Sequence, residues 1–278
     1  CLMVAVGVTL LGLGTAATVT LFDFRGRAVF EWLLLLPLAM PAYVVAYAYT
    51  DFLQFSGPLQ VSLREFFGWR GALWPDVRSV WGAALVFTVS LYPYVYLLAR
   101  TALLERVASL MEAARLLGAP LSRRIREVAL PLSRPAVAAG VALALMETLA
   151  DFGVSSYFGI QTFTAGIYKA WLAMDNRVAA AQLATVLLLV VLALLNLEQR
   201  AERRMRFAQG RVSRQGTAES QPVHLRGVQQ GMAWIVCGVP VLLGFVLPVL
   251  ILLRALVGSE VESSWTRFGD WAWNSLRL

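Results

Sequence analysis

The sequence is poor in the residues from which most metal and disulfide sites are built. Its 278 residues include two cysteines and one histidine. Cys1 and Cys237 lie in apolar segments, and neither has a second cysteine at disulfide or metal-ligand spacing. His224 stands alone in a polar segment, which excludes a metal site built from histidines. The sequence therefore predicts no firm metal site and no disulfide framework.

A near-absence of lysine bears on nucleotide chemistry. A phosphate-binding P-loop needs a glycine-rich turn followed by Lys and then Ser or Thr. The one lysine, Lys169, stands in the sequence Ile167-Tyr168-Lys169-Ala170, which has neither feature. We therefore expect no ATP site in this chain. Any nucleotide hydrolysis that it depends on would belong to a partner protein.

Charge is scarce as well, and this decides the class of protein. Hydrophobic residues make up 59% of the chain and charged residues 15%, with a mean hydropathy of +0.66. That excludes a soluble domain, and several apolar runs reach the roughly 20 residues that cross a bilayer. The net charge of +7 falls on arginines in a few loops between these runs. This is the pattern of a protein embedded in a lipid bilayer and not of one that binds nucleic acid.

Six apolar segments are predicted to span the membrane, at about 1–21, 31–53, 80–98, 134–150, 179–197 and 231–253. The first is rich in small residues, which let membrane helices approach closely. Pro37 and Pro41 are predicted to kink or locally unwind the second. We expect a turn-rich loop over 54–78, and part helix and part loop over 151–177. The chain lacks an initiator Met and a seventh span begins at its end, so we expect a fragment truncated at both ends.

The distribution of basic residues predicts how the spans are oriented. Two sets of alternate loops can be compared. The first set comprises the loops at 22–31, 100–134 and 198–228, which carry 16 Lys and Arg in total. The second set comprises those at 54–79, 151–178 and 254–272, which carry 7. Because basic loops remain in the cytoplasm, the first set is predicted to be cytoplasmic.

One polar stretch interrupts the apolar pattern between the third and fourth spans. It runs from Glu112 to Pro131, EAARLLGAPLSRRIREVALP. Apolar residues recur at helical spacing up to Gly118, which is a good helix stop, and Pro120 suits the first turn of a new helix. In the second helix one face is apolar and the other carries three arginines and Glu127. We expect Pro131 to end or kink it, which leaves a bent pair of amphipathic helices suited to docking on another protein.

This stretch resembles the loop shared by permease subunits of binding-protein-dependent ABC importers. The family pattern is E-A-A, three residues, G, nine residues, an aliphatic residue, one residue, then L-P. It is matched by Glu112, Ala113, Ala114, Gly118, Val128, Leu130 and Pro131. Val128 stands where the family usually has Ile. Several fixed identities at two fixed spacings make the resemblance specific.

The resemblance implies a fold, a location and partners. The fold would be all-α, a polytopic transmembrane helical bundle of the type I importer permease (MetI-like) kind, in the bacterial inner membrane. The seven matched residues would form an ATPase-coupling loop, within residues 100–134, that docks on a cytoplasmic ABC ATPase dimer. A periplasmic substrate-binding protein would deliver the substrate to the outer face. ATP would be used by the ATPase, while the permease would bind no cofactor, contain no catalytic residue and not be an enzyme.

A second resemblance, to ferric-iron permeases, narrows the substrate. It is carried by Met146 to Gly153, Tyr157 to Gly159 and Phe163 to Tyr168, and by Leu36 to Tyr43 with Tyr49 to Asp51. Those permeases typically consist of two fused halves, each with its own coupling loop. The resemblance thus implies that ferric iron is the substrate that the protein moves from the binding protein to the cytoplasm.

The same resemblance implies how the chain is divided. Residues 1–197 would be a first permease repeat, present in part, with five spans. Residues 198–230 would form a cytoplasmic linker, and residues 231–278 would begin a second repeat. The remaining span of the first repeat and a second coupling loop would lie outside this sequence.

Four residues are candidates for the translocation path: Glu147, Asp151, Tyr157 and Tyr43. A carboxylate near the end of a span is costly, so it usually faces protein or water. Ferric iron favours oxygen ligands, which makes the carboxylates and phenols chemically admissible contacts. The alternative is structural: the carboxylates hydrogen-bond or pair with neighbouring helices, and the tyrosines anchor span ends or pack in the bundle.

The sequence also allows other functions. Importers of thiamine, polyamines, sulfate, phosphonate or another small solute share the coupling loop and similar spans. A more remote alternative is a membrane-embedded enzyme or assembly scaffold that uses Glu147 and Asp151.

Overall fold

The computed structural model describes residues 1–104, 108–209, 223–258 and 265–277, and these are mostly helical, as predicted. The first helices are α1 (Leu2–Leu21), α2 (Arg27–Leu33), α3 (Ala42–Leu53), α4 (Pro58–Phe67), α5 (Val80–Ala102), α6 (Ala108–Leu116) and α7 (Leu121–Arg124). The later ones are α8 (Leu130–Ala150), α9 (Gly153–Phe158), α10 (Phe163–Tyr168), α11 (Arg177–Gln209), α12 (Val228–Val241), α13 (Leu247–Gly258) and α14 (Trp265–Arg277). Shorter elements are the 3-10 turn η1 (Leu36–Ala39), the π turns η3 (Ile125–Ala129), η4 (Lys169–Ala173) and η5 (Leu242–Val246), and the strands β1 (Phe22–Asp23) and β2 (Val223–His224).

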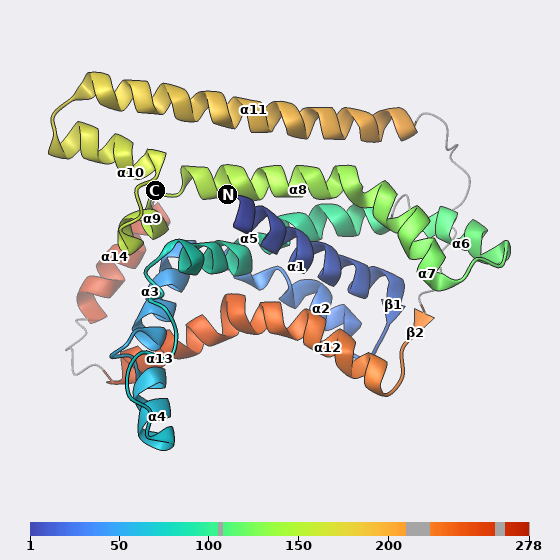
Figure 1. Cartoon of the computed structure of the whole chain (residues 1–278), viewed down its shortest axis with the longest axis horizontal. Helices are drawn as coiled ribbons and strands as arrows, with labels where there is room; N and C mark the ends of the chain where they lie inside the picture. Colours follow the sequence, from blue (N-terminus) through green and yellow to red (C-terminus); the bar gives the residue numbers. More distant parts are fainter. Residues whose placement is uncertain (105–107, 210–222, 259–264, 278) are drawn as a thin grey trace.

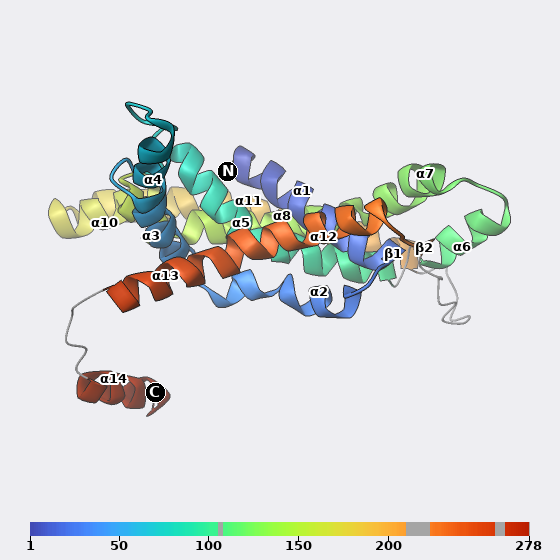
Figure 2. The same ribbon diagram turned by 90° about the horizontal axis from the view of Figure 1, so that it is seen from below.

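Four long helices pack side by side as the core of the bundle. α1 packs along α5, α5 along α8, and α8 along α11 (Figure 1). Strands β1 and β2 lie with α6 and α7 at one end, here called the α7 end, whereas α3, α9 and α10 lie at the other, the α9 end (Figures 1 and 2). The molecule therefore has two distinct ends, and the three arginine-rich loops predicted to share one side all approach the α7 end.

Small residues allow these helices to pack closely, as predicted for the first span. A Cβ on Gly12 of α1 would lie 2.6 Å from the Cβ of Val95 and 2.9 Å from the carbonyl oxygen of Tyr92 on α5. A Cβ on Gly140 of α8 would lie 2.7 Å from the Cα of the same Val95. Contacts this short leave room only for glycine, so α5 is held between two neighbours at backbone distance.

The predicted second span is broken. The helical segments Arg27–Ala39 and Ala42–Phe67 meet at an angle of 88°. The break falls at Met40 and Pro41, where the backbone is extended and the proline supplies no N–H to continue a helix. The predicted kink or local unwinding is therefore confirmed, and the segment counts as one span only as this bent pair. The turn-rich loop predicted over 54–78 is partly wrong, because α4 occupies its first half.

Buried tyrosines of α5 satisfy carbonyls at the C-terminal end of α2. The hydroxyl of Tyr92 donates to the Leu34 carbonyl at 3.0 Å, and that of Tyr96 to the Glu31 carbonyl at 3.2 Å. The last carbonyls of a helix lack partners within it, so their capture by buried hydroxyls satisfies both groups at once. The Glu31 carboxylate also pairs with Arg27 at 3.3 Å and with Arg100 of α5 at 2.9 Å, which ties α2 to α5.

The fourth span does not begin where it was predicted. One helical run extends from Leu121 to Ala150, through α7, η3 and α8, so Pro131 does not end it. In an α-helix the ring of Pro131 would clash with the carbonyl four residues earlier. The wider π turn η3 stands just before it, and the Leu130 N–H donates to the Ile125 carbonyl, five residues back. η5 precedes Leu247-Pro248 in the same way, so these two π turns each accommodate a proline.

The segment after the fifth span begins as a helix. α11 continues to Gln209, so the first part of the predicted linker over 198–230 is helical. Residues 210–222 lie outside the described residues. β2 then pairs in parallel with β1, and His224 Nδ1 lies 2.8 Å from an Asp23 carboxylate oxygen. From there α12 packs on α1, η5 on α5, and α13 on α3.

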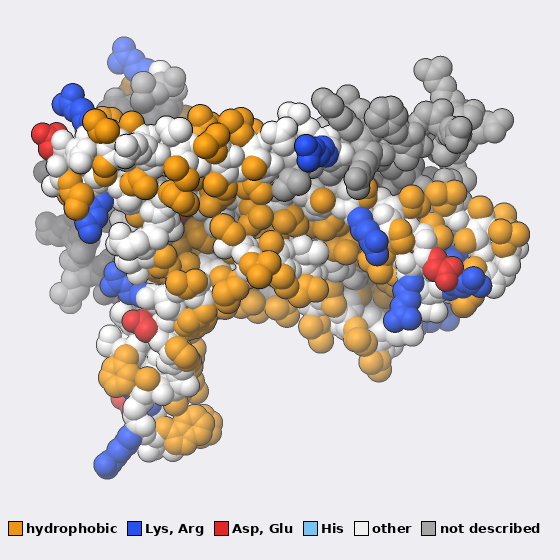
Figure 3. All heavy atoms as spheres, turned by 45° about the horizontal axis from the view of Figure 1, so that its top comes forward, with side chains coloured by type: hydrophobic (Ala, Val, Ile, Leu, Met, Phe, Trp, Pro, Cys, Tyr) orange, Lys and Arg blue, Asp and Glu red, His pale blue; other side chains and the backbone are white. Residues whose placement is uncertain are grey.

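By length and composition, five helices in the described residues are able to cross a membrane, or six if the bent pair counts as one span. These agree with the six predicted segments in number and approximate place. Figure 3 shows hydrophobic side chains over the middle of one face of the bundle and Lys and Arg towards its two sides. This arrangement matches an apolar bilayer core between two polar surfaces.

Candidate functional site

The turn between α6 and α7 has the geometry that its sequence predicts. Gly118 has a φ of +80°, in the left-handed region that favours glycine. Its N–H donates to the Arg115 carbonyl at 2.9 Å, and the Ala119 N–H donates to the Ala114 carbonyl at 3.0 Å. These two bonds form a Schellman motif, which closes the end of α6. Pro120 then starts α7, so the pair of helices is bent as predicted.

The second half of this stretch buries its predicted apolar face. Ala129 is buried, and Leu121, Ile125 and Val128 are partly buried against the core cluster. On the opposite face Arg123 and Glu127 form an exposed ion pair of 2.9 Å. Because η3 leads straight into α8, this face is fixed to a helix of the core. Displacement of the loop would therefore act directly on α8.

The tip of the stretch exposes apolar side chains. Leu116, the last residue of α6, is 82% exposed, and Leu117, which follows it, is 88% exposed. Leu117 belongs to the apolar residues that recur at helical spacing before Gly118, and so does Met111, which is only 5% exposed. Glu112 is partly buried and lies 3.6 Å from Arg115. Two exposed leucines beside a defined turn suit a docking surface better than a solvent-exposed loop.

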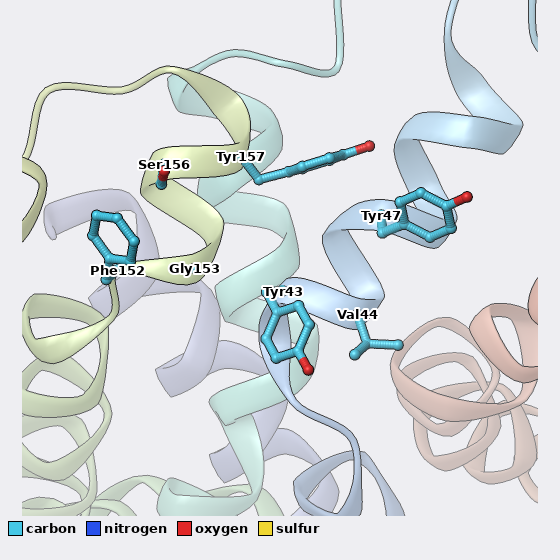
Figure 4. A pocket seen from close by; sticks show the side chains of 7 residues that line it. All are labelled: Tyr43, Val44, Tyr47, Phe152, Gly153, Ser156 and Tyr157. Carbon is cyan, nitrogen blue, oxygen red and sulfur yellow. The ribbon is translucent and has the colours of Figure 1, made fainter. Parts of the chain in front are cut away.

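At the α9 end, a cavity of about 410 Å³ lies between α3 and α9 (Figure 4). It is lined by Tyr43, Val44, Tyr47, Phe152, Gly153, Ser156 and Tyr157. The rings of Tyr47 and Tyr157 are 6.1 Å apart between centroids, and Figure 4 shows their hydroxyls directed to the same side. A Cβ on Gly153 would lie 2.8 Å from the Cβ of Tyr43, so glycine here sets the spacing of α3 and α9.

A basic residue from the loop before α5 borders this cavity. Arg78 donates from Nη2 to the Tyr157 carbonyl at 2.6 Å, and its guanidinium lies 5.3 Å from the centre of the Tyr157 ring. The lining itself consists of phenols, one serine hydroxyl and apolar groups. The cavity therefore offers neutral oxygen atoms, with positive charge at its border.

Asp151 joins three elements beside the cavity. Its carboxylate accepts a hydrogen bond from the Val154 N–H at 2.8 Å, which caps the start of α9. Its carbonyl accepts from the hydroxyls of Ser155 and Thr164, each at 2.9 Å. Burial raises the pKa of the Asp151 carboxyl above its ordinary value, and the hydrogen bonds from the Val154 and Ser155 amides offset part of that rise. These contacts give Asp151 the structural role that was the alternative to a place in the path.

The structure brings some of the predicted path residues together and leaves one apart. Tyr43 and Tyr157 line the same cavity, and Asp151 immediately precedes two lining residues. Glu147 lies in the last turn of α8 with its side chain exposed and is not part of the lining. Among the residues that the structure describes, no group of three or more His, Cys, Asp or Glu is placed to hold a metal ion.

Sequence reasoning missed several members of both sites. Arg78 lies 79 residues before Tyr157, and nothing in the sequence joins the two. Phe152 and Gly153 fall inside the stretch from Met146 to Gly153 that resembles ferric-iron permeases but were not singled out, and Ser156 lies between two such stretches. Leu116 lies outside the apolar stripe of α6, and its exposure became visible only in the fold.

A membrane-spanning helical bundle with a bent helical loop at one end and an aromatic cavity at the other defines a class of transport proteins. Comparison with known families agrees: the family of binding-protein-dependent transport system inner membrane components matches residues 9–207. The chain belongs to this family. Its predicted recognition and its all-α fold class are thereby confirmed.

Curated relatives include transporters of several substrates. An Fe(3+)-transport system permease protein of Haemophilus influenzae is 28% identical over 191 residues, covering 68% of this chain and 34% of that protein. A molybdenum transport system permease protein of Escherichia coli is 33% identical over 135 residues, covering 49% of this chain and 57% of that protein. A sulfate transport system permease protein of Salmonella typhimurium is 30% identical over 145 residues, covering 51% of this chain and 49% of that protein. The chain thus spans about a third to a little over half of the length of these relatives.

Proposed function

We propose that this chain forms part of the permease of an ABC importer, with residues 112–131 as the element that docks on a separate ATPase. The observation that carries the proposal is the geometry of that stretch. The pattern residues Ala114 and Gly118 form the Schellman turn, Leu116 and Leu117 are exposed beside it, and Val128 packs the loop against the core. A surface of this kind, continuous with α8, transmits a displacement to the bundle.

In this proposal the α7 end lies in the cytoplasm and the α9 end in the periplasm. The excess of basic residues at the loops of the α7 end supports that orientation. A periplasmic binding protein would deliver its substrate at the α9 end, where the cavity lies. ATP binding and hydrolysis by the partner would shift the bundle between outward-open and inward-open states, because each nucleotide state favours one arrangement.

We propose the domain organisation on the same basis. Residues 1–197 form a first permease repeat and residues 231–278 begin a second. The packing of α12, η5 and α13 on α1, α5 and α3 supports a close association of the two repeats. The segment between the two repeats starts with the last turns of α11 and ends with β2. Both lie at the α7 end (Figure 1), so in this proposal the segment begins and ends on the cytoplasmic side.

For the substrate we favour ferric iron. Support comes from the iron-permease relative, which is 28% identical over 191 residues and aligns with 68% of this chain. The cavity supplies oxygen atoms from Tyr43, Tyr47 and Tyr157, which are weak ligands for a hard cation. Weak contacts suit transport, because a tight site would slow release into the cytoplasm.

An oxyanion such as molybdate or sulfate is the second candidate. One observation favours it: the guanidinium of Arg78 borders the cavity, where a positive charge would attract an anion and repel a cation. The phenol and serine hydroxyls would then act as hydrogen-bond donors to the oxyanion.

Uptake in a strain that lacks the transporter distinguishes the two candidates. Cells carrying the intact transporter are given radiolabelled ferric iron, with unlabelled molybdate or sulfate as competitor, and then labelled molybdate and sulfate directly. The proposal predicts iron uptake that these anions do not reduce. If an anion is taken up and iron is not, that anion is the substrate and the assignment of iron is wrong. If none of them is taken up, both candidates are rejected.

A further inference from the structure

A groove of about 620 Å³ runs along the outside of the bundle between α1, α8 and α11. Leu13 of α1 and Leu194 of α11 form its two sides. Its floor is one face of α8, where Val137, Val141 and Leu145 recur every fourth residue. The groove is therefore a built feature of three neighbouring helices, distinct from both the coupling stretch and the cavity at the α9 end.

The groove lies where the bilayer would be. Its α8 lining falls within the run Leu121–Ala150, and α1 and the adjoining part of α11 are likewise long and apolar enough to cross a membrane. Leu13 belongs to the middle of α1, and Leu194 lies near the end of the apolar part of α11. An apolar groove at this depth faces hydrocarbon, where acyl chains fill surface hollows.

One charged side chain changes what the groove can hold. Arg134 is in the lining and is exposed, at the end of the groove nearest to α7. No ion pair joins it to an acidic side chain that the structure describes, a set that does not include the side chains of Glu198 and Glu202 on α11. The neighbouring Ser133 hydroxyl already donates to the Leu130 carbonyl at 3.1 Å. A guanidinium at the edge of the hydrocarbon is costly unless an anion pairs with it.

We propose that this groove binds one anionic phospholipid, with an acyl chain along Val137, Val141 and Leu145 and the phosphate at Arg134. A planar guanidinium matches phosphate oxygens in a bidentate geometry, and basic pockets between membrane helices are known to favour anionic headgroups. Arg134 would thus select an anionic headgroup, and the apolar floor would hold the acyl chain. Assignment to the inner leaflet rests on the orientation given under the proposed function.

The proposed lipid site would affect coupling to the ATPase because Arg134 lies on α8, the helix that continues from the docking stretch. Arg134 is three residues after Pro131, on the run that extends unbroken from α7 to the end of α8. A lipid phosphate held there would contact the same rigid element that the docking stretch displaces. Anionic lipid would then restrain the α7 end of α8 in one position.

Native mass spectrometry of the purified protein tests the proposal. The protein is released from detergent with phosphatidylglycerol or phosphatidylcholine of matched chains, and the bound lipid is counted. Wild-type protein is expected to retain one phosphatidylglycerol in preference to phosphatidylcholine. R134Q is expected to bind phosphatidylglycerol about fivefold more weakly, as the loss of one arginine near an anionic headgroup predicts. R126Q removes the same charge from the exposed face of η3 outside the groove and should not change the binding.

A second variant keeps the test independent of charge. Ala138 lines the groove and is exposed, so A138F fills the apolar floor without removing a buried group. It should weaken retention of both lipids. Equal binding in wild type, R134Q and A138F would overturn the proposal. So would a complete lack of retained lipid, which is the result expected if another protein segment covers the groove. Because the readout is lipid binding, a wrong substrate assignment would leave it unaffected.

Discussion

Helix α8 passes α5 so closely that a Cβ on Gly140 would lie 2.7 Å from the Cα of Val95. In a bilayer, helices gain little from excluding water, so association depends on close packing of small residues. The same α5 residue is approached from α1 by Gly12. α5 is therefore approached at Val95 by glycines of two neighbouring helices.

Substitution of Gly12 and Gly14, two of the three glycines of α1, tests this packing. G12A should destabilise the purified protein by about 1–3 kcal/mol, because the added methyl overlaps the α5 backbone. G14A is a matched control two residues away, since nothing lies within 4 Å of a Cβ at Gly14. Thermal unfolding in detergent measures both. If G12A and G14A unfold at the same temperature, the close approach of α1 and α5 is not a source of stability.

The left-handed turn at Gly118 leads to a prediction about coupling. G118V should sharply reduce uptake and uncouple the ATPase, because a β-branched residue is strongly disfavoured at a φ of +80°. G118N should retain much more activity, since Asn tolerates the left-handed region. Nothing lies within 4 Å of a Cβ at Gly118, so crowding does not explain a difference between them.

Membrane extracts provide the control for this comparison. Both variants should be found in the membrane at the wild-type level, as should E112K, for which we also expect impaired coupling. Normal transport by G118V would show that the shape of the turn does not matter for function.

The raised pKa of Asp151 predicts a pH dependence of stability. A carboxyl whose pKa is higher in the folded than in the unfolded state binds protons more tightly when folded, so its contribution is greatest at low pH and is lost as the pH rises through the folded value. D151N cannot titrate and can still accept the hydrogen bond from the Val154 N–H. Its melting temperature relative to wild type should therefore increase from about pH 4 upwards. A difference that stays constant with pH would contradict the shift.

Gly153 tests whether the aromatic cavity belongs to the transport path. A methyl group at this position would lie 2.8 Å from the Cβ of Tyr43, so G153A should push α9 away from α3 and lower uptake several-fold. G166A is the control, because its methyl would meet only the end of the Leu183 side chain, at 3.4 Å. Initial uptake rates, normalised to the protein present in the membrane, would reveal the effect. Equal rates would remove the cavity from the path.

Glu147 needs a test of its own because it lies outside the cavity lining. An exposed carboxylate in the last turn of a spanning helix requires a polar neighbour, which in the assembled transporter would be water in the path or another repeat. E147Q should therefore reduce uptake while leaving the melting temperature of this part of the protein unchanged. Unaltered uptake would take Glu147 off the set of path residues.

The sequence was sufficient to predict the class of fold and most of the docking stretch. Apolar runs specify spans, and the bent turn follows from Gly118 and Pro120, whose backbone preferences act locally. Pro131 was predicted to end or kink the second helix; it does not end it, because a π turn ahead of it accommodates the proline ring, and such a turn has no distinct local signature. Pro37 and Pro41 predicted a kink or local unwinding, but the sequence pattern carries no measure of its angle, which is 88°.

The cavity depended on contacts between distant segments and so was predicted only in part. Tyr43 and Tyr157 were identified from residue type and place, yet their proximity depends on Gly153, which permits α9 to approach α3. Asp151 was predicted as a candidate for the path. Its hydrogen bonds to Val154, Ser155 and Thr164 link α8, α9 and α10, a role that its position after a span did not reveal.

Site-specific photocrosslinking tests the central claim, which is that residues 112–131 dock on an ATPase. A photoreactive amino acid is placed at Leu117, which is 88% exposed beside the turn, and in a second protein at Leu172, which is 70% exposed at the α9 end. After irradiation of intact cells the crosslinked partners are identified by mass spectrometry. The account predicts an ABC ATPase subunit captured from Leu117 and not from Leu172. Capture of no ATPase at Leu117, or equal capture from both positions, would contradict it.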